Sequence, residues 1–336
     1  METTRLGRTG LMVTRTSFGV LPLQRVAKEE AVRILRRALD AGINFYDTAR
    51  GYTDSEEKIG AAFADVRPRV FIATKSPATT RDALLRDVEA SLRHLRTDHV
   101  DILQLHNPDR LPDPEDDASA LAGLRQAQRE GKTRFIGLTN HSIERACQAA
   151  DSGIYDTLQF PLTTLSDDKD LALIERCRRN DVGLIAMKPL SGGLLTDVRG
   201  VFAFFRQHPG VAPIYGIQTM GELEQFLALE ADPPAMDDLL RARIEHDRRE
   251  LGGAFCRACG YCLPCPAEIP IPMAARMQLL LRRLPPAQFQ TPEWRQRMNR
   301  IHDCRDCGEC RARCPYHLDP PAMMRAALAD YEKFNA

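Results

Sequence analysis

The sequence has no apolar run that approaches the ~20 residues a transmembrane helix needs. It also has no excess charge of either sign, with 46 basic and 46 acidic side chains among 336 residues. Balanced charge gives no argument for a nucleic-acid partner. The N-terminal METTRLGRTG lacks the apolar core of a secretory signal. We therefore expect a cytoplasmic protein without a membrane or nucleic-acid partner, and its 43% hydrophobic residues suit a sizeable core.

A third absence bears on the fold. Short β-rich runs alternate with amphipathic helical stretches, but the G-x-G-x-x-G turn that usually follows the first strand of a doubly wound sheet is missing. The repeats, with strands apolar enough to be buried on both faces, predict an α/β fold, a (β/α)8 TIM barrel over residues 1–240, with a hairpin at its start. The eight β-rich runs are residues 16–20, 43–48, 70–75, 100–106, 133–140, 157–161, 182–189 and 212–217.

Polar side chains gather where the predicted strands end, which is the catalytic face of such a barrel. Asp47, Lys75 and His106 end three successive strands, and Tyr52 lies in the loop after Asp47. A phenol has a pKa of ~10, so Tyr52 needs a nearby cation to exchange protons near neutral pH. Lys75, held by Asp47, is expected to lower that pKa, and His106 to donate to a substrate oxygen. Each residue alone is more often a cap or a packing residue, but the set of four favours a site.

These segments resemble the aldo-keto reductase superfamily over residues 1–230. The resemblance is carried by TRLGRTGLMVTRTSFG at the N-terminus and by DTARGYTDSEEKIG, ATKSP and LQLHNPD. It implies that Asp47, Tyr52, Lys75 and His106 form a catalytic tetrad, with Tyr52 as general acid/base. It also implies a nicotinamide cofactor, NADH or NADPH, bound without a Rossmann domain, and a small-molecule carbonyl or alcohol substrate.

The same resemblance implies a set of cofactor-binding residues. GLTN and the following strand match the carboxamide site, AMKPLSGGLL matches a subgroup's pyrophosphate turn, and YGIQTMGELEQFLA takes the place of the adenine-binding segment, where Phe226 also falls. A carboxylate there would repel a 2′-phosphate but could accept a bond from a 2′-hydroxyl, so the choice between NADH and NADPH stays open. The alternative role of Asn140 and Gln159 is to satisfy backbone hydrogen bonds, and that of Gly192 and Gly193 is to form a tight turn. The implied residues are Thr139, Asn140, Gln159, Met187, Lys188, Gly192, Gly193, Gly216 and Glu222.

Eight of the ten cysteines fall into two runs near the C-terminus, CRACGYCLPCP and CRDCGECRARCP, whereas Cys147 and Cys177 lie alone at helical core spacing. The second run has the C-x2-C-x2-C-x3-C-P spacing of [4Fe–4S] ligation, and the first is one residue shorter. Zinc also takes C-x2-C pairs, but quartets followed by proline favour clusters. We predict a small α-helical ferredoxin-like domain over residues 252–336 with two [4Fe–4S] clusters. The fourth cysteine of each run is expected to serve the other cluster. The predicted ligand sets are Cys256, Cys259, Cys262 and Cys314 for one cluster, and Cys304, Cys307, Cys310 and Cys265 for the other.

Over its full length the chain resembles aldo-keto reductases that carry a C-terminal ferredoxin-like extension. This combination leaves two enzymatic functions open, and a non-catalytic scaffold is a third. The first is hydride transfer between nicotinamide and a carbonyl, with structural or modulatory clusters. The alternative is an electron-transfer oxidoreductase that exchanges electrons with a ferredoxin-type partner. No flavin signature is present that could pass the two electrons of a hydride on to a cluster one at a time. The Arg-rich segment 271–301 between the cysteine runs is expected to be mainly a solvated face.

Overall fold

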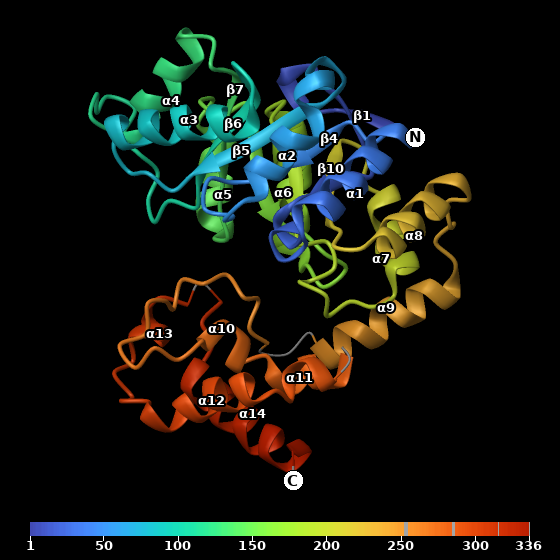
Figure 1. Ribbon diagram of the computed structural model, residues 1–336, viewed down its shortest axis with the longest axis vertical. Helices are drawn as coiled ribbons and strands as arrows, with labels where there is room; N and C mark the ends of the chain where they lie inside the picture. Colours follow the sequence, from blue (N-terminus) through green and yellow to red (C-terminus); the bar gives the residue numbers. More distant parts are fainter. Residues whose placement is uncertain (252–254, 284–285, 315, 336) are drawn as a thin grey trace. The chain divides into compact units, whose positions relative to one another are not determined.

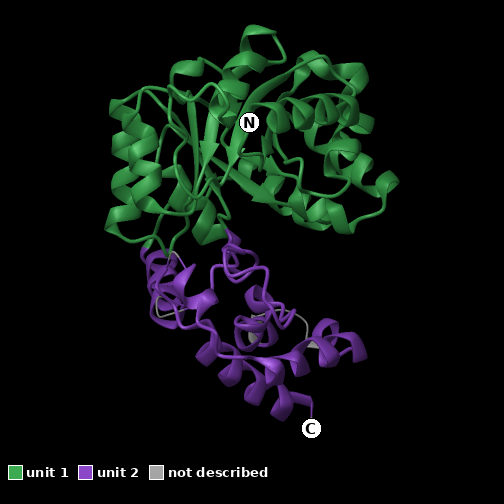
Figure 2. Cartoon of the chain, turned by 90° about the vertical axis from the view of Figure 1, so that its left-hand side faces the viewer, with its two compact units in different colours: residues 1–189, 199–237 green, residues 190–198, 238–336 purple. Residues whose placement is uncertain are grey.

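The computed structural model describes residues 1–251, 255–283, 286–314 and 316–335. The chain forms two compact units, coloured separately in Figure 2. The first comprises Met1–Pro189 and Arg199–Asp237, and the second comprises Leu190–Val198 and Asp238–Ala336. The expected domain division at residues 240–252 therefore stays a proposal, and Leu190–Val198 joins the second unit unexpectedly. Gly252, Gly253, Pro285 and Pro315 lie outside the described residues.

The first unit is a closed barrel of parallel strands, in the order β10-β3-β4-β5-β6-β7-β8-β9 (Figure 1). This confirms the predicted α/β TIM barrel, and each strand begins and ends within two residues of its predicted run. Apolar strands of this kind are buried on both faces, inside by the barrel core and outside by helices. The strands are β3 Ser17–Gly19, β4 Phe45–Asp47, β5 Phe71–Ser76, β6 Val100–His106, β7 Thr133–Thr139, β8 Thr157–Pro161, β9 Gly183–Met187 and β10 Val211–Gly216.

Amphipathic helices surround the strands. In α1 the apolar side chains recur at i, i+3, i+4 and i+7, so Ala31, Ile34, Leu35, Ala38 and Leu39 are buried on one face, as their spacing predicts. Ser142 and Asp167 cap α5 and α6 by accepting a backbone N–H in the first turn. The helices of this unit are α1 Lys28–Asp40, α2 Ser55–Phe63, α3 Arg81–Leu95, α4 Ala120–Arg129, α5 Ile143–Asp151, α6 Asp168–Arg179, α7 Val198–Arg206 and α8 Met220–Ala231.

The N-terminal hairpin of β1 (Thr3–Arg5) and β2 (Met12–Thr14) closes the end of the barrel where the strands begin. Leu6, Leu11 and Val13 belong to the same buried core cluster as barrel-strand residues such as Ile102. A Cβ on Gly7 would lie 2.2 Å from the backbone nitrogen of Gly183, so only glycine permits this approach. This plug leaves the carboxyl ends of the strands as the open face of the barrel.

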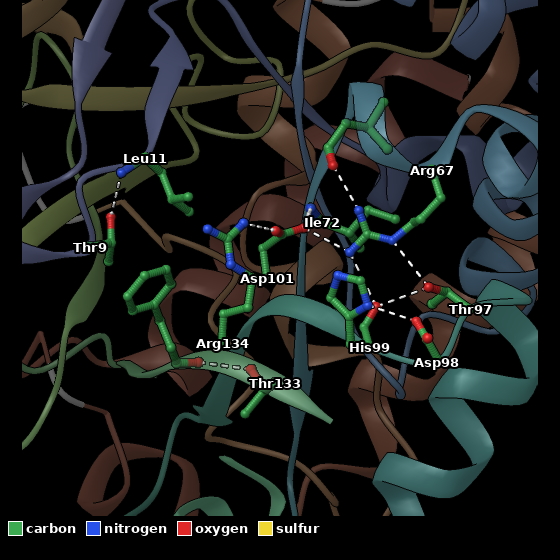
Figure 3. Close-up of polar contacts among 12 residues, drawn as sticks. Thr9, Leu11, Arg67, Ile72, Thr97, Asp98, His99, Asp101, Thr133 and Arg134 are labelled. Atoms are coloured by element: carbon green, nitrogen blue, oxygen red, sulfur yellow. Dashed lines mark hydrogen bonds and ion pairs between the residues drawn. The ribbon is translucent and has the colours of Figure 1, made fainter. Parts of the chain in front are cut away.

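A buried carboxylate, that of Asp101, also links the N-terminal ends of neighbouring strands by hydrogen bonds. Asp101, the second residue of β6, is 2% exposed and accepts hydrogen bonds from Arg67 Nη2 (2.7 Å), Arg134 Nη1 (2.7 Å) and the Ile72 N–H (2.9 Å) (Figure 3). Thr9 and Leu11 of the hairpin are bonded to each other within the same view. A buried charge is tolerated when hydrogen bonds satisfy it, so Asp101 joins β5, β6 and β7 at this end.

The second unit is small and α-helical, as predicted, with no strand among its described residues. No helix in the described part of the chain is long and apolar enough to cross a membrane. Arg295 and Arg297 are exposed as expected, but Arg276 is buried, so the Arg-rich segment is not one solvated face. The unit's helices are α9 Asp238–Leu251, α10 Ile271–Ala274, α11 Met277–Arg283, α12 Pro292–Asn299, α13 Glu309–Ala312 and α14 Pro320–Asn335.

Candidate active site

A buried ion pair lies at the carboxyl ends of β4 and β5. Lys75 Nζ donates to Asp47 Oδ1 at 2.6 Å and to the Thr48 carbonyl oxygen at 2.6 Å. Asp47 ends β4, and β5 pairs with β4 in parallel, so the register of the barrel places both side chains at the open end. These two bonds hold the buried Lys75 ammonium in place, and the Asp47 carboxylate balances its charge.

Tyr52 and His106 lie beside this pair. The Lys75 ammonium is 5.2 Å from the centroid of the Tyr52 ring. The Tyr52 and His106 rings meet edge to face, with centroids 5.6 Å apart. Tyr52 reaches this position from the loop between β4 and α2, and His106 from the last residue of β6. The four side chains that the sequence singled out are thus brought together.

Burial decides the protonation of these groups. It raises the pKa of Tyr52, and although Lys75 acts in the opposite direction, Asp47 adds to the rise. Lys75 therefore lowers the pKa of Tyr52 as expected, but burial outweighs it, because desolvating a phenolate costs more than one paired lysine returns. Burial, followed by the charges of Lys75 and Lys188, lowers the pKa of His106 to about 3. Tyr52 is thus a neutral phenol and His106 a neutral imidazole at physiological pH.

Two glutamines support Asp47 from inside the barrel. Gln159 Nε2 donates to Asp47 Oδ1 at 3.3 Å, and Gln104 Nε2 lies 3.5 Å from Asp47 Oδ2 and 3.0 Å from Gln159 Oε1. These bonds favour ionised Asp47, whereas burial raises its pKa. Gly137 makes room for this layer, since a Cβ there would lie 3.0 Å from Gln104 Cγ.

The other predicted cofactor residues on β7 and β9 are buried at the open end of the barrel. Thr139 Oγ1 lies 3.8 Å from Met187 Sδ, so these two side chains are neighbours. The Asn140 amide donates to the Pro108 carbonyl at 2.9 Å and accepts from the Ser142 N–H at 2.8 Å. Asn140 thus has a structural role at the start of α5, and it retains one amide N–H beyond these bonds.

The segment around α8 differs more from expectation. The Glu222 carboxylate accepts the backbone N–H groups of Gln218 (2.7 Å) and Thr219 (3.0 Å), which makes it part of a capping box. Gly216 ends β10 and is exposed. Phe226 is buried, with its ring centroid 4.3 Å from that of Tyr215, so it is a core residue and not an adenine contact.

Lys188, Gly192 and Gly193 follow β9 and all have positive φ, at 57°, 66° and 90°. This is the left-handed region that glycine adopts without strain. Lys188 belongs to the barrel and acts electrostatically on His106. Gly192 and Gly193 belong to the second unit, where the Gly193 N–H donates to the Leu190 carbonyl at 2.9 Å. Gly192 and Gly193 therefore form a tight turn, and their role in binding a pyrophosphate stays a prediction.

The eight clustered cysteines line two cavities of the second unit. One is lined by the first three thiols of the second run together with Cys262 and Cys265, and the other by the first three thiols of the first run together with Cys314. Cys262 lines both. Cys265 thus lies with the second run and Cys314 with the first, and the crossed ligand pairing stays a prediction. Among the described residues no three metal-binding side chains converge on one point. The first cavity is lined by Cys262, Cys265, Cys304, Cys307 and Cys310, and the second by Cys256, Cys259, Cys262 and Cys314.

Comparison with known proteins assigns the barrel. The family model of the aldo/keto reductase family matches residues 12–226. The chain belongs to the aldo/keto reductase family. A second family model, that of a 4Fe-4S dicluster domain, matches residues 255–319, so this reductase carries a C-terminal iron–sulfur domain of the dicluster type.

Characterised relatives of this aldo/keto reductase are similar over part of their length. L-galactose dehydrogenase of Arabidopsis thaliana is 32% identical over 216 residues, covering 59% of this chain and 68% of that protein. L-glyceraldehyde 3-phosphate reductase of Escherichia coli is 30% identical over 218 residues, covering 56% and 62%. An aldo/keto reductase from Klebsiella pneumoniae, solved with NADP and acetate, superposes with a TM-score of 0.62 at 25% identity, covering 73% of this chain and 94% of that one. The chain thus spans about two thirds of these curated relatives' length.

Two residues of this site were not singled out from the sequence. Gln104 stands two residues before His106 in an otherwise apolar run, and that spacing places both side chains on one face of β6, which is a readable signal. His141 directly follows Asn140. Burial lowers its pKa well below the usual range, and the charges of Lys188 and His106 add to the effect. His141 is therefore a second neutral imidazole on which His106 acts electrostatically.

Proposed function

We propose that this aldo/keto reductase interconverts a small-molecule carbonyl and its alcohol by hydride transfer from or to a nicotinamide cofactor, with Tyr52 as general acid/base. The observation that carries the proposal is the neutral phenol of Tyr52 held between the Lys75 ammonium and the His106 imidazole. A phenol with a raised pKa is a proton donor over the physiological range, which suits the direction of carbonyl reduction.

Each residue has a defined part in that step. The nicotinamide, when bound, supplies or accepts the hydride at the substrate carbon. Tyr52 donates its hydroxyl proton to the carbonyl oxygen as negative charge develops there. His106, neutral because of its low pKa, orients that oxygen by a hydrogen bond. Lys75, paired with Asp47 at 2.6 Å, stabilises the phenolate that remains.

The open end of the barrel has donors suited to a nicotinamide carboxamide. Asn140 and Gln159 each keep one amide N–H beyond the bonds that they make within the protein. Thr139 and Met187 lie together beside them, and Lys188 adds a positive charge. We propose that these residues hold the nicotinamide end. Gly192 and Gly193 stay predicted pyrophosphate contacts. The NADP bound to the Klebsiella relative supports a dinucleotide cofactor. Gly216 remains a proposed contact, whereas Glu222 is engaged as a helix cap.

We further propose two [4Fe–4S] clusters with the crossed ligand sets. Five thiols line one cavity and four line the other, with Cys262 in both, and thiolates are the ligands that such clusters take. Burial raises the pKa of Cys262 to about 12, and the charges of Cys256 and Cys259 add to the rise.

Replacing Tyr52 by phenylalanine tests the central proposal. We expect Tyr52→Phe to lower kcat for carbonyl reduction by about 10²–10⁴, because it removes only the exchangeable proton. Dinucleotide affinity, measured by fluorescence titration, should stay unchanged. Tyr155→Phe is the matched control, because the buried Tyr155 hydroxyl has no hydrogen-bond partner among the described residues. Wild-type turnover in Tyr52→Phe would end the proposal.

One observation favours the second candidate, electron exchange with a ferredoxin-type protein. Cys262 and Ile271 line both thiol cavities, so two bound clusters would be neighbours, and Cys307 of the first cavity is exposed. Anaerobic EPR spectra recorded after addition of NADH, NADPH, substrate or a reduced ferredoxin would decide. Spectra that change only with dithionite would reject this candidate.

A further inference from the structure

A buried carboxylate that the proposed mechanism does not use lies beside the loop that carries Tyr52. Glu56, in the first turn of α2, is 1% exposed. Its Oε2 accepts a hydrogen bond from Arg50 Nη1 at 2.5 Å, and its Oε1 accepts one from the Thr74 hydroxyl at 2.7 Å. Arg50 Nη1 also lies 3.0 Å from His94 Nδ1, and because a guanidinium only donates, that imidazole nitrogen accepts. Both oxygens of Glu56 are therefore bonded, and Arg50 balances the buried charge.

The bond to Thr74 connects Glu56 to the strand that carries the catalytic lysine. Thr74 directly precedes Lys75 on β5, and successive side chains of a strand point to opposite faces. Lys75 accordingly points into the barrel, where it meets Asp47, whereas Thr74 points outward to α2. Glu56 thus holds the strand at the position next to Lys75.

The bond to Arg50 connects Glu56 to the loop of Tyr52. The Arg50 N–H donates to the Lys75 carbonyl at 2.9 Å, so this loop continues the pairing of β4 with β5 beyond the end of β4. The Tyr52 N–H donates to the Ala49 carbonyl at 3.0 Å, which makes a tight turn. Arg50 precedes Tyr52 by two residues and Glu56 follows it by four, so their ion pair joins the two sides of the loop.

We propose that Glu56 is a positioning residue for proton transfer by Tyr52. Through Arg50 it fixes the loop of Tyr52, and through Thr74 it fixes the strand segment of Lys75. The Lys75 ammonium therefore stays 5.2 Å from the centroid of the Tyr52 ring. This inference rests on the proposed function, because it needs Tyr52 as the proton donor.

The physical basis is the cost of misplacement. A shift of about 1 Å in a reacting group can lower a rate by about 10²-fold. A buried carboxylate that loses its cation destabilises its surroundings until they rearrange, so the ion pair restricts where the loop can lie. Replacing Glu56 by glutamine removes the charge and leaves Thr74 an amide oxygen as acceptor. The guanidinium of Arg50 then loses its anionic partner, and the loop is released.

A double-mutant cycle separates positioning from a general structural role. Turnover of the full chain is measured with NADPH and para-nitrobenzaldehyde as the carbonyl probe. We expect Glu56→Gln to lower kcat by about 10²-fold, with dinucleotide affinity unchanged. In the Tyr52→Phe background the same substitution should leave kcat unchanged, because Glu56 acts through the phenol. An independent structural role would lower kcat by the same factor in both backgrounds, and that result overturns the proposal, as does a wild-type kcat in Glu56→Gln.

Two further variants serve as rescue and control. Arg50→Met should lose as much activity as Glu56→Gln, and Arg50→Lys, which keeps the charge without the planar fork, should lose less. Asp101→Asn is the matched control, since that carboxylate is also buried and paired with arginines but lies at the other end of the barrel. Its kcat should stay at the wild-type value. If Glu56→Gln does not fold, the cycle of Arg50→Lys with Tyr52→Phe decides by the same criterion.

Amide hydrogen exchange tests the loop without any substrate. The Arg50 N–H is bonded to the Lys75 carbonyl and should be protected in the wild type. We expect Glu56→Gln to lose this protection and Asp101→Asn to keep it. Protection retained in Glu56→Gln overturns the proposal whatever the activity. Wild-type turnover in Tyr52→Phe contradicts the proposed function instead, and the protection at Arg50 then decides whether Glu56 holds this loop.

Discussion

At the scale of single residues, this site is governed by desolvation. Tyr52 lies beside a lysine and still has a raised pKa, and His106 lies beside two lysines and loses its basicity. Both shifts keep the Tyr52 phenol and the His106 imidazole neutral. The Lys75–Asp47 pair holds the charge deeper in the barrel, at 2.6 Å.

The pH dependence of turnover follows from these directions. Carbonyl reduction needs protonated Tyr52, so its rate should be flat between about pH 6 and about pH 9 and fall only above the usual phenol pKa of ~10. Alcohol oxidation needs the phenolate, so its rate should rise about tenfold per pH unit over the same range. Steady-state rates in both directions across pH test this. An inflection near pH 6.5 that disappears in His106→Gln would contradict a neutral His106.

Most residues of the candidate active site could be predicted from the sequence, because they are polar side chains at the ends of otherwise apolar strands. Lys75 and His106 end apolar strands where a polar side chain has no packing role, and Tyr52 follows one such strand closely. The sign of the Tyr52 shift could not be predicted, since it depends on how much protein surrounds the phenol. Arg276 could not be predicted either, because its partner Ser191 stands 85 residues earlier in the chain.

At the scale of elements, one end of the barrel stabilises the fold and the other end carries the candidate active site. The starts of β5, β6 and β7 are joined by Asp101, Arg67 and Arg134, while their carboxyl ends carry Lys75, His106 and Thr139. Alternating strands and amphipathic helices made the elements readable from sequence. The tight approach of Gly7 to Gly183 was not readable, because one glycine in a turn does not identify the backbone that it meets.

Stability and activity should therefore be separable by mutation at Asp101. Asp101→Asn leaves two arginines facing a neutral amide, and loss of one partner from a buried ion pair costs about 3–5 kcal/mol. We expect the free energy of unfolding of the barrel to fall by about 3 kcal/mol, with kcat unchanged because the site is at the opposite end. Urea unfolding followed by circular dichroism measures the first quantity. Asp98→Asn, at a carboxylate that is 93% exposed, is the control, and equal unfolding midpoints for the two variants would refute the role of Asp101.

At the scale of the whole molecule, we propose that the two cysteine runs bind clusters jointly. The cavity of the first run includes Cys314, and the cavity of the second includes Cys265. Each run by itself would leave one quartet incomplete. The spacing of the second run was enough to propose this crossing, because it recurs in two-cluster ferredoxins, and the first run differs by one residue.

Double variants distinguish the crossed pairing from a local one. With crossed ligands, Cys256→Ser with Cys314→Ser should lose about half of the iron, no more than either single variant, because both serve one cluster. Cys256→Ser with Cys265→Ser should lose nearly all of it. A local pairing reverses these two results. Iron and sulfide analysis of anaerobically purified protein provides the readout, and Cys147→Ser, outside both cavities, should retain the full content.

The chain passes between its two units at residues 189/190, 198/199 and 237/238, so the iron–sulfur unit is not a detachable tail. Shortening the protein before Asp238 would leave Leu190–Val198 behind, without Arg276 and Arg243, which hold it. A chimaera that borrows this unit from another reductase must exchange two separate stretches of sequence.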